Sequence, residues 1–133
     1  MAALIVDTHA AVWYLSDSVR LSSVALEALE RTSASGDPIF LASISLVEII
    51  YLVEKERLPE AALERLEAAL ADPGTPFDIV PLHADIARLL RQIPRDQVPD
   101  MPDRIIAGTA LWLGVPLVTR DRKIQASALS SIW

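Results

Sequence analysis

Short apolar runs alternate along the chain with longer segments whose apolar residues recur at helical spacing. The runs are bounded by Pro, Gly, Ser or Asp, as strands usually are, and cover residues 2–6, 38–42, 77–81 and 116–119. Helical patterns lie at 8–15, 22–32, 45–58, 59–71, 83–93 and 102–114. This alternation predicts an α/β fold with a central, mostly parallel sheet of roughly four to five strands, flanked by helices on both faces.

The segment 45–58 is apolar almost all round its predicted helix, so we expect burial on several sides or contact with a partner. The helix at 59–71 begins at Pro59, directly after it. The two segments therefore predict an αα-hairpin whose excess apolar surface is available for a protein contact.

Composition and length indicate one folded domain over residues 1–133. Hydrophobic residues make up 52% of the sequence and charged residues 23%, which excludes a disordered chain. The sequence shows no internal repeat and no Gly/Ser-rich linker. No apolar run approaches the roughly 18 residues of a membrane span, and the first residues lack the features of a secretory signal. We therefore expect a soluble cytoplasmic protein.

The residue types narrow the possible chemistry. The chain has no cysteine, which excludes disulfides, thiolate nucleophiles and the usual structural zinc sites. Its two histidines, His9 and His83, are expected to be ordinary first-turn residues. Any metal must therefore be held by oxygen atoms. The formal charge of −6 argues against a protein that coats nucleic acid, although a local binding patch is compatible with it.

Carboxylates stand near the ends of predicted strands. Asp7 ends the first strand, Glu48 lies in the helix after the second, and Asp121 follows the last. In a parallel sheet these positions share the carboxyl edge, where ligands bind. Asp103 lies at the start of the helix that precedes the last strand. We expect a helix in this place to begin at the far edge of the sheet, unless the proline-rich loop before it (93–102) displaces it.

Each of these acids also has a purely structural explanation at a helix start. Ser45 and Glu48 match the S-x-x-E capping box. The other acids that fit N-cap or first-turn positions are Asp7, Asp100, Asp103 and Asp121. However, carboxylates about 5 Å apart repel by roughly 3 kcal/mol per pair at an effective dielectric constant near 20. Caps worth about 1 kcal/mol each do not offset that repulsion, whereas a bound divalent cation does.

An all-oxygen site of this kind suits Mg²⁺ or Mn²⁺. Such ions activate a water molecule toward a phosphodiester without a side-chain nucleophile. Thr8 and Thr119 stand beside two of the acids and are candidates to hydrogen-bond a carboxylate.

Four stretches, "VDTHAAVW", "SLVEI", "PDRIIAGTA" and "LVTRDRKI", together resemble the PIN-domain ribonucleases of the VapC toxin type. The resemblance covers essentially the whole chain. It implies a PIN-like α/β fold with an acidic cluster that binds Mg²⁺ or Mn²⁺ and cleaves RNA. It also implies an endoribonuclease that is the toxin of a type II toxin–antitoxin module and is silenced by a cognate antitoxin.

Position by position, the resemblance assigns the catalytic and metal-binding acids to Asp7, Glu48, Asp103 and Asp121, with Asp100 as an additional ligand. It also implies that the helix carrying Asp103 reaches the cluster. The cations expected near RNA are Arg104, Arg120, Arg122 and Lys123, with Arg95 a weaker candidate. For Trp13 and Tyr14, core packing is favoured over base stacking. The αα-hairpin is expected to form a homodimer contact or an antitoxin seat.

Two other functions compete with this interpretation. A catalytically silent PIN-like interaction module would use the acids as helix caps alone. A phosphatase with an aspartyl nucleophile would place that nucleophile at Asp7, but such enzymes need a second aspartate two residues later, where this chain has His9.

Overall fold

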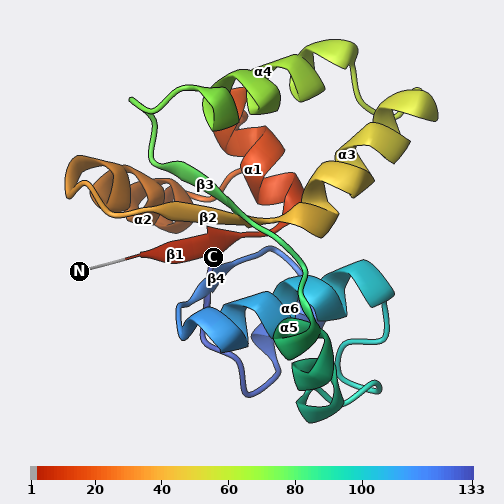
Figure 1. Cartoon of the computed structure of the whole chain (residues 1–133). Helices are drawn as coiled ribbons and strands as arrows, with labels where there is room; N and C mark the ends of the chain where they lie inside the picture. Colours follow the sequence, from red (N-terminus) through yellow and green to blue (C-terminus); the bar gives the residue numbers. More distant parts are fainter. Residues whose placement is uncertain (1–2) are drawn as a thin grey trace.

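The computed structural model describes residues 3–133 as alternating strands and helices (Figure 1). The strands are β1 (Leu4–Val6), β2 (Ile39–Ala42), β3 (Phe77–Val80), β4 (Leu117–Val118) and β5 (Ser131–Ile132). The helices are α1 (Thr8–Leu15), α2 (Ser23–Ala34), α3 (Ser43–Glu54), α4 (Glu60–Ala71), α5 (Ala84–Leu89) with the 3₁₀ turn η1 (Leu90–Gln92), α6 (Met101–Leu113) and α7 (Arg122–Gln125).

The strands form one five-stranded sheet in the order β3-β2-β1-β4-β5, and every pair is parallel. The predicted α/β fold class is therefore confirmed. The short strand β5 was not predicted as a separate segment; it pairs with β4 through Leu117 and Ser131. Because every pair is parallel, the carboxyl ends of the strands share one edge of the sheet, and Figure 1 shows β1 and β2 running toward it from left to right.

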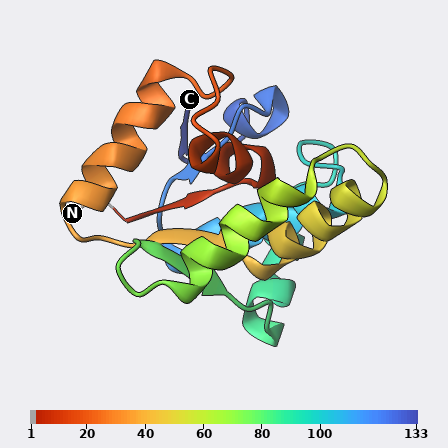
Figure 2. The ribbon, with the colours of Figure 1, turned by 90° about the horizontal axis from the view of Figure 1, so that it is seen from above.

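Helices cover both faces of the sheet. Figure 1 shows α1 and α4 on one side and α5 and α6 on the other, and Figure 2 shows α1 and α4 from above. Alternate residues of β1 pack into the hydrophobic layers on the two faces of the sheet, because successive side chains of a strand point to opposite faces. Leu4 and Val6 belong to the hydrophobic cluster that includes α1 and α4, whereas Ile5 belongs to the cluster with α6 and α7.

Helix starts and ends follow the local sequence signals at most positions. The side chains of Asp7, Ser22 and Asp100 cap α1, α2 and α6. Gly114 ends α6 with a φ of 69°, a left-handed conformation that glycine adopts at little cost. The segment 83–93 forms the shorter α5 followed by η1, and His83 is the N-cap residue instead of a first-turn residue.

The capping box predicted for Ser45 and Glu48 is wrong. Helix α3 begins at Ser43 after the N-cap residue Ala42, so Ser45 lies inside the first turn. Its hydroxyl lies 3.0 Å from the hydroxyl of Thr8, far away in sequence. Both residues are therefore used in a tertiary contact and not in local capping.

The αα-hairpin forms as predicted, with α3 and α4 in contact (Figure 1). Helix α3 is less covered than its sequence suggested, because Ser45 and Ile49 are its buried residues. Val47 and Tyr51 are 46% and 57% exposed. Apolar surface of α3 thus faces solvent in the single chain. Within residues 3–133, no helix is both long and apolar enough to cross a membrane.

Candidate active site

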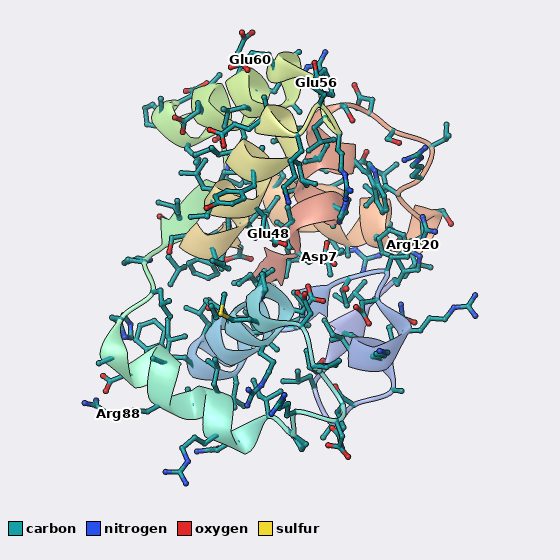
Figure 3. The ribbon with its side chains drawn as sticks, turned by 90° about the vertical axis from the view of Figure 1, so that its right-hand side faces the viewer. Asp7, Glu48, Glu56, Glu60, Arg88 and Arg120 are labelled. Atoms are coloured by element: carbon teal, nitrogen blue, oxygen red, sulfur yellow. The ribbon has the colours of Figure 1, made fainter. Side chains whose placement is uncertain are left out.

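Acidic side chains from separate segments line one open cavity of about 550 Å³ at the carboxyl edge of the sheet. The acids are Asp7, Glu48, Asp100, Asp103 and Asp121. Figure 3 views this edge and shows Asp7 and Glu48 near each other between the upper helices and α6, with Arg120 to one side. The four acids predicted from sequence are therefore brought together, along with Asp100.

The expectation that connectivity would start the helix of Asp103 at the far edge is wrong. Helix α6 ends at Leu113, and β4 begins at Leu117 after a short turn. A helix that feeds a parallel strand runs antiparallel to it, so its first residues lie at the carboxyl edge. Asp103 in the first turn of α6 therefore reaches the cavity through regular topology, without displacement by the preceding loop.

Asp7 is held by hydrogen bonds on both oxygens. Its Oδ1 accepts from the backbone N–H of Ala10 at 2.8 Å, and its Oδ2 accepts from the hydroxyl of Thr119 at 2.6 Å. Burial raises the pKa of the Asp7 carboxyl, and the hydrogen bonds from Thr119 and Ala10 oppose this rise. The side chain is thus both an N-cap and a fixed, desolvated acid in the cavity.

Thr119 connects Asp7 with Asp121. While its hydroxyl donates to Asp7, its Oγ1 accepts from the backbone N–H of Asp121 at 3.0 Å. Asp121 caps α7, since its Oδ1 accepts from the N–H groups of Lys123 and Ile124 at 2.8 and 3.2 Å. The buried Thr119 therefore positions the two acids that follow β1 and β4 relative to each other.

Glu48 is oriented by the buried Thr8. The Thr8 hydroxyl donates to Glu48 Oε1 and lies 3.0 Å from the hydroxyl of Ser45. Burial raises the pKa of the Glu48 carboxyl, the Thr8 hydrogen bond lowers it, and the negative charge of Asp100 raises it. Thr8 therefore ties the acid on α3 to the first turn of α1.

Asp103 is a partly buried acid surrounded by other negative charges in the cavity. Burial raises its pKa from 3.8 to about 7, and the negative charges of Asp100, Asp121, Glu48 and Asp7 contribute in that order. In the part of the chain that the structure describes, no hydrogen bond or ion pair reaches its carboxylate. Crowding of like charges is thus present at this acid and is not relieved by a cationic side chain.

The match to known families covers this whole arrangement, since the model of the PIN domain matches residues 4–128. The chain belongs to the PIN-domain family. It is 32% identical over 128 residues to the curated Ribonuclease VapC22 of Mycobacterium tuberculosis, covering 95% of this chain and 92% of that protein.

Two solved structures share the fold. A VapBC2 complex from Rickettsia felis bound to a promoter DNA fragment superposes with a TM-score of 0.72 at 20% identity, covering 97% of this chain and 96% of the other. A toxin–antitoxin complex from Klebsiella pneumoniae gives 0.70 at 23% identity, covering 98% and 96%. The predicted family and PIN-like fold are confirmed.

The donor set of this PIN domain suits a hard divalent cation. Carboxylate and hydroxyl oxygens dominate the cavity, with the imidazole of His9 at the same opening. Among residues 3–133, no three Asp, Glu or His side chains already stand in a metal-binding arrangement. Asp7 and Glu48 accept hydrogen bonds from Thr119 and Thr8, and each carboxylate oxygen keeps a further lone pair for a cation.

The cations predicted near RNA lie in three different places. Arg120 lines the acidic cavity, with its Cζ 5.5 Å from the ring centroid of Trp13. Arg122 and Lys123 line an adjoining cavity of about 470 Å³. Arg104 faces inward, where its Nη2 donates to the carbonyls of Leu90 and Ile93 at 2.6 and 3.0 Å. Arg104 therefore holds the turn before α6, and Arg95 lines neither of these two cavities.

Three further side chains line the acidic cavity. His9 and Arg20 were not predicted there, and Trp13 was expected in the core. Trp13 does pack against the core cluster, and it also faces the cavity; Tyr14 packs near Phe77, with 6.1 Å between ring centroids. The sequence did contain a signal for His9, because it stands two residues after Asp7. Arg20 offered no such signal, because it lies in the irregular segment after α1.

Proposed function

We propose that this PIN domain is a Mg²⁺- or Mn²⁺-dependent endoribonuclease and the toxin of a type II toxin–antitoxin module. The observation that carries the proposal is the convergence of Asp7, Glu48, Asp103 and Asp121 on one open cavity. The resemblance to a protein named a ribonuclease supports RNA as the substrate.

The proposed mechanism assigns a role to each acid. Asp7, Glu48, Asp103 and Asp121 would hold the cation, and Asp100 would assist at the start of α6. When bound, the cation supplies Lewis-acid activation of water and neutralises charge on the leaving oxygen of a phosphodiester. Thr119 and Thr8 fix the orientations of Asp7 and Glu48 through their hydrogen bonds.

The test is RNA cleavage by purified protein with Mg²⁺ or Mn²⁺. We expect cleavage that EDTA abolishes and that Asp7→Asn or Asp103→Asn reduces by at least about 100-fold, because each substitution breaks the cation's ligand set. Asp78→Asn is the matched control, since Asp78 is exposed on the edge strand β3. Folding of all variants is checked by circular dichroism.

Equal cleavage by all four proteins would contradict the mechanism. A folded wild-type protein that binds no Mn²⁺ by calorimetry and cleaves no RNA would favour the silent interaction module. Cleavage of a phosphomonoester with transfer of phosphate to Asp7 would favour the phosphatase.

The partners follow from the same proposal. Several solved relatives are toxin–antitoxin or VapBC complexes, which supports a cognate antitoxin for this chain. We further propose that the chain forms a homodimer through the exposed apolar surface of α3, and that residues 1–133 make up a single PIN domain.

A further inference from the structure

One wall of the acidic cavity carries rings and guanidinium groups. Its residues are His9, Trp13, Arg20 and Arg120. The ring centroids of His9 and Trp13 are 5.6 Å apart, and the guanidinium of Arg120 lies over the Trp13 ring. The wall therefore combines flat surfaces with positive charge beside a negatively charged floor.

The Trp13 ring is held in place by packing. Trp13 packs partly buried against the core cluster, and its ring centroid lies 5.9 Å from that of Trp133 near the end of the chain. His9, in the first turn of α1, is exposed. A ring that is already held in place loses little conformational entropy when a ligand stacks against the wall.

The guanidinium groups are not neutralised by the neighbouring acids. The ion pairs found within residues 3–133 join Arg31 with Glu27 and Arg88 with Asp85, both on distant helix surfaces. Arg20 and Arg120 line the same cavity as five carboxylates and pair with none of them. Their charge is therefore available for an anionic group of a ligand.

A second cavity shares three of the acids. Asp100, Asp103 and Asp121 line both cavities, and the second one adds Arg122 and Lys123. Cations thus line both of the cavities that share these carboxylates. A polyanionic strand that runs through both cavities would meet positive charge in each of them, but aromatic rings only in the cavity lined by Trp13.

We propose that His9, Trp13, Arg20 and Arg120 form a subsite for one unpaired nucleotide of a single-stranded RNA lying along the cavity. The inference takes its substrate class from the proposed function. The base stacks against the ring wall, and Arg20 and Arg120 contact the adjoining phosphates. Bases inside a duplex cannot reach such a wall, so the subsite selects single strands over double strands.

The test measures binding without cleavage, with Asp103→Asn present in every protein. The probes are a fluorescently labelled pool of random single-stranded RNA 12-mers, the same strands hybridised to complements, and a 12-mer of abasic ribose phosphate. Fluorescence anisotropy gives Kd for each. The variants are Trp13→Leu, His9→Ala and Arg20→Ala, with Trp112→Leu and Arg91→Ala as matched controls on surfaces away from both cavities.

We expect Trp13→Leu to weaken binding of the single-stranded pool roughly tenfold, as loss of one base stack does. His9→Ala, at an exposed position, should weaken it in the same direction. Neither variant should change binding of the abasic strand or of the duplex. Arg20→Ala should weaken binding of the normal and abasic strands equally and reduce the salt slope by about 0.7, the value for one phosphate of a single strand.

The inference is overturned if Trp13→Leu and His9→Ala bind the pool within twofold of the controls, or if the abasic strand shows the same losses as the pool. Failure of the parent protein to prefer the pool over duplex also overturns it. Failure of the proposed function gives a different result. If binding depends on Trp13 but the protein with Asp103 intact cleaves no RNA, the subsite is supported and the nuclease activity is contradicted.

Discussion

At the scale of single residues, the most informative group is the carboxyl of Asp103. Its pKa in the folded protein is raised to about 7 by burial and by the surrounding acids. The folded state therefore binds this proton more tightly than the unfolded chain does. The resulting destabilisation is absent below about pH 4, grows as pH rises toward 7, and is constant above that.

Asp103→Asn removes this penalty. In metal-free protein we expect the variant to melt roughly 2–4 °C above wild type at pH 8, allowing for solvent screening of a partly exposed group, with a smaller difference at pH 5. Differential scanning calorimetry in EDTA at both pH values measures the effect. Asp78→Asn is the control. A variant that is no more stable than wild type at pH 8 would show that the acids do not repel one another.

Thr119 offers a second prediction at this scale. Thr119→Val removes the buried hydroxyl that donates to Asp7 Oδ2 and leaves this carboxylate oxygen without that donor. We expect RNA cleavage to fall by roughly 10–100-fold and the required Mg²⁺ concentration to rise. The measurement is cleavage rate against Mg²⁺ concentration.

Thr109→Val is the matched control, because Thr109 is also buried but its hydroxyl donates to the carbonyl of Ile105 within α6. Similar losses in both variants would point to a general packing effect and count against a specific role for Thr119.

The residue types of the candidate site could be predicted, but their contacts could not. The family pattern named the four acids, and adjacency in sequence suggested Thr8 and Thr119. The same adjacency made Arg104 a candidate for RNA, yet its guanidinium turns toward the carbonyls of Leu90 and Ile93. The direction of a side chain depends on tertiary neighbours, which one sequence does not reveal.

At the scale of elements, the helix caps considered at Asp7, Asp100 and Asp121 are present, and the structure adds one at Ser22. Ser22 Oγ accepts from the N–H of Ala25 at 3.1 Å and begins α2 away from the cavity. We expect Ser22→Ala to cost about 1 kcal/mol and lower Tm by roughly 3–4 °C for a chain of this length, without loss of RNA cleavage.

Ser23→Ala is the control for that substitution, since Ser23 is exposed at the first helical position. The measurement is the melting temperature of each variant and of the wild type under the same conditions. Equal melting temperatures would mean that the Ser22 hydroxyl does not contribute to stability.

Two other elements show the limits of pattern reading. Ser45 and Glu48 have the spacing of a capping box, but β2 ends at Ala42 and α3 follows at once, so the helix starts earlier than the motif suggests. Strand β5 has two residues, too few for an alternating pattern to be visible. The expectation for Asp103 is wrong for a different reason: α6 runs antiparallel to β4, which puts its first turn at the carboxyl edge of the sheet.

At the scale of the whole molecule, negative charge is concentrated at one edge of the sheet. The formal charge is −6, and the five acids of the cavity account for all but about −1 of it. Bound divalent cations would therefore bring this face close to neutrality, and the basic side chains that line the two cavities would then dominate the field met by a phosphate backbone. An acidic sequence is thus compatible with an RNA substrate.

The assembly state is the last property at this scale. Helix α3 leaves Val47 and Tyr51 exposed, although its sequence is apolar almost all round. We expect the purified chain to elute with about twice its monomer mass in size-exclusion chromatography with light scattering. Val47→Glu and Tyr51→Glu should shift it to the monomer, because a charge buried in an apolar contact costs several kcal/mol. Val24→Glu, on the exposed side of α2, should leave the dimer intact. A monomeric wild type, or a dimer that survives both α3 substitutions, would show that this helix does not join two copies and would leave its apolar surface to another protein such as the antitoxin.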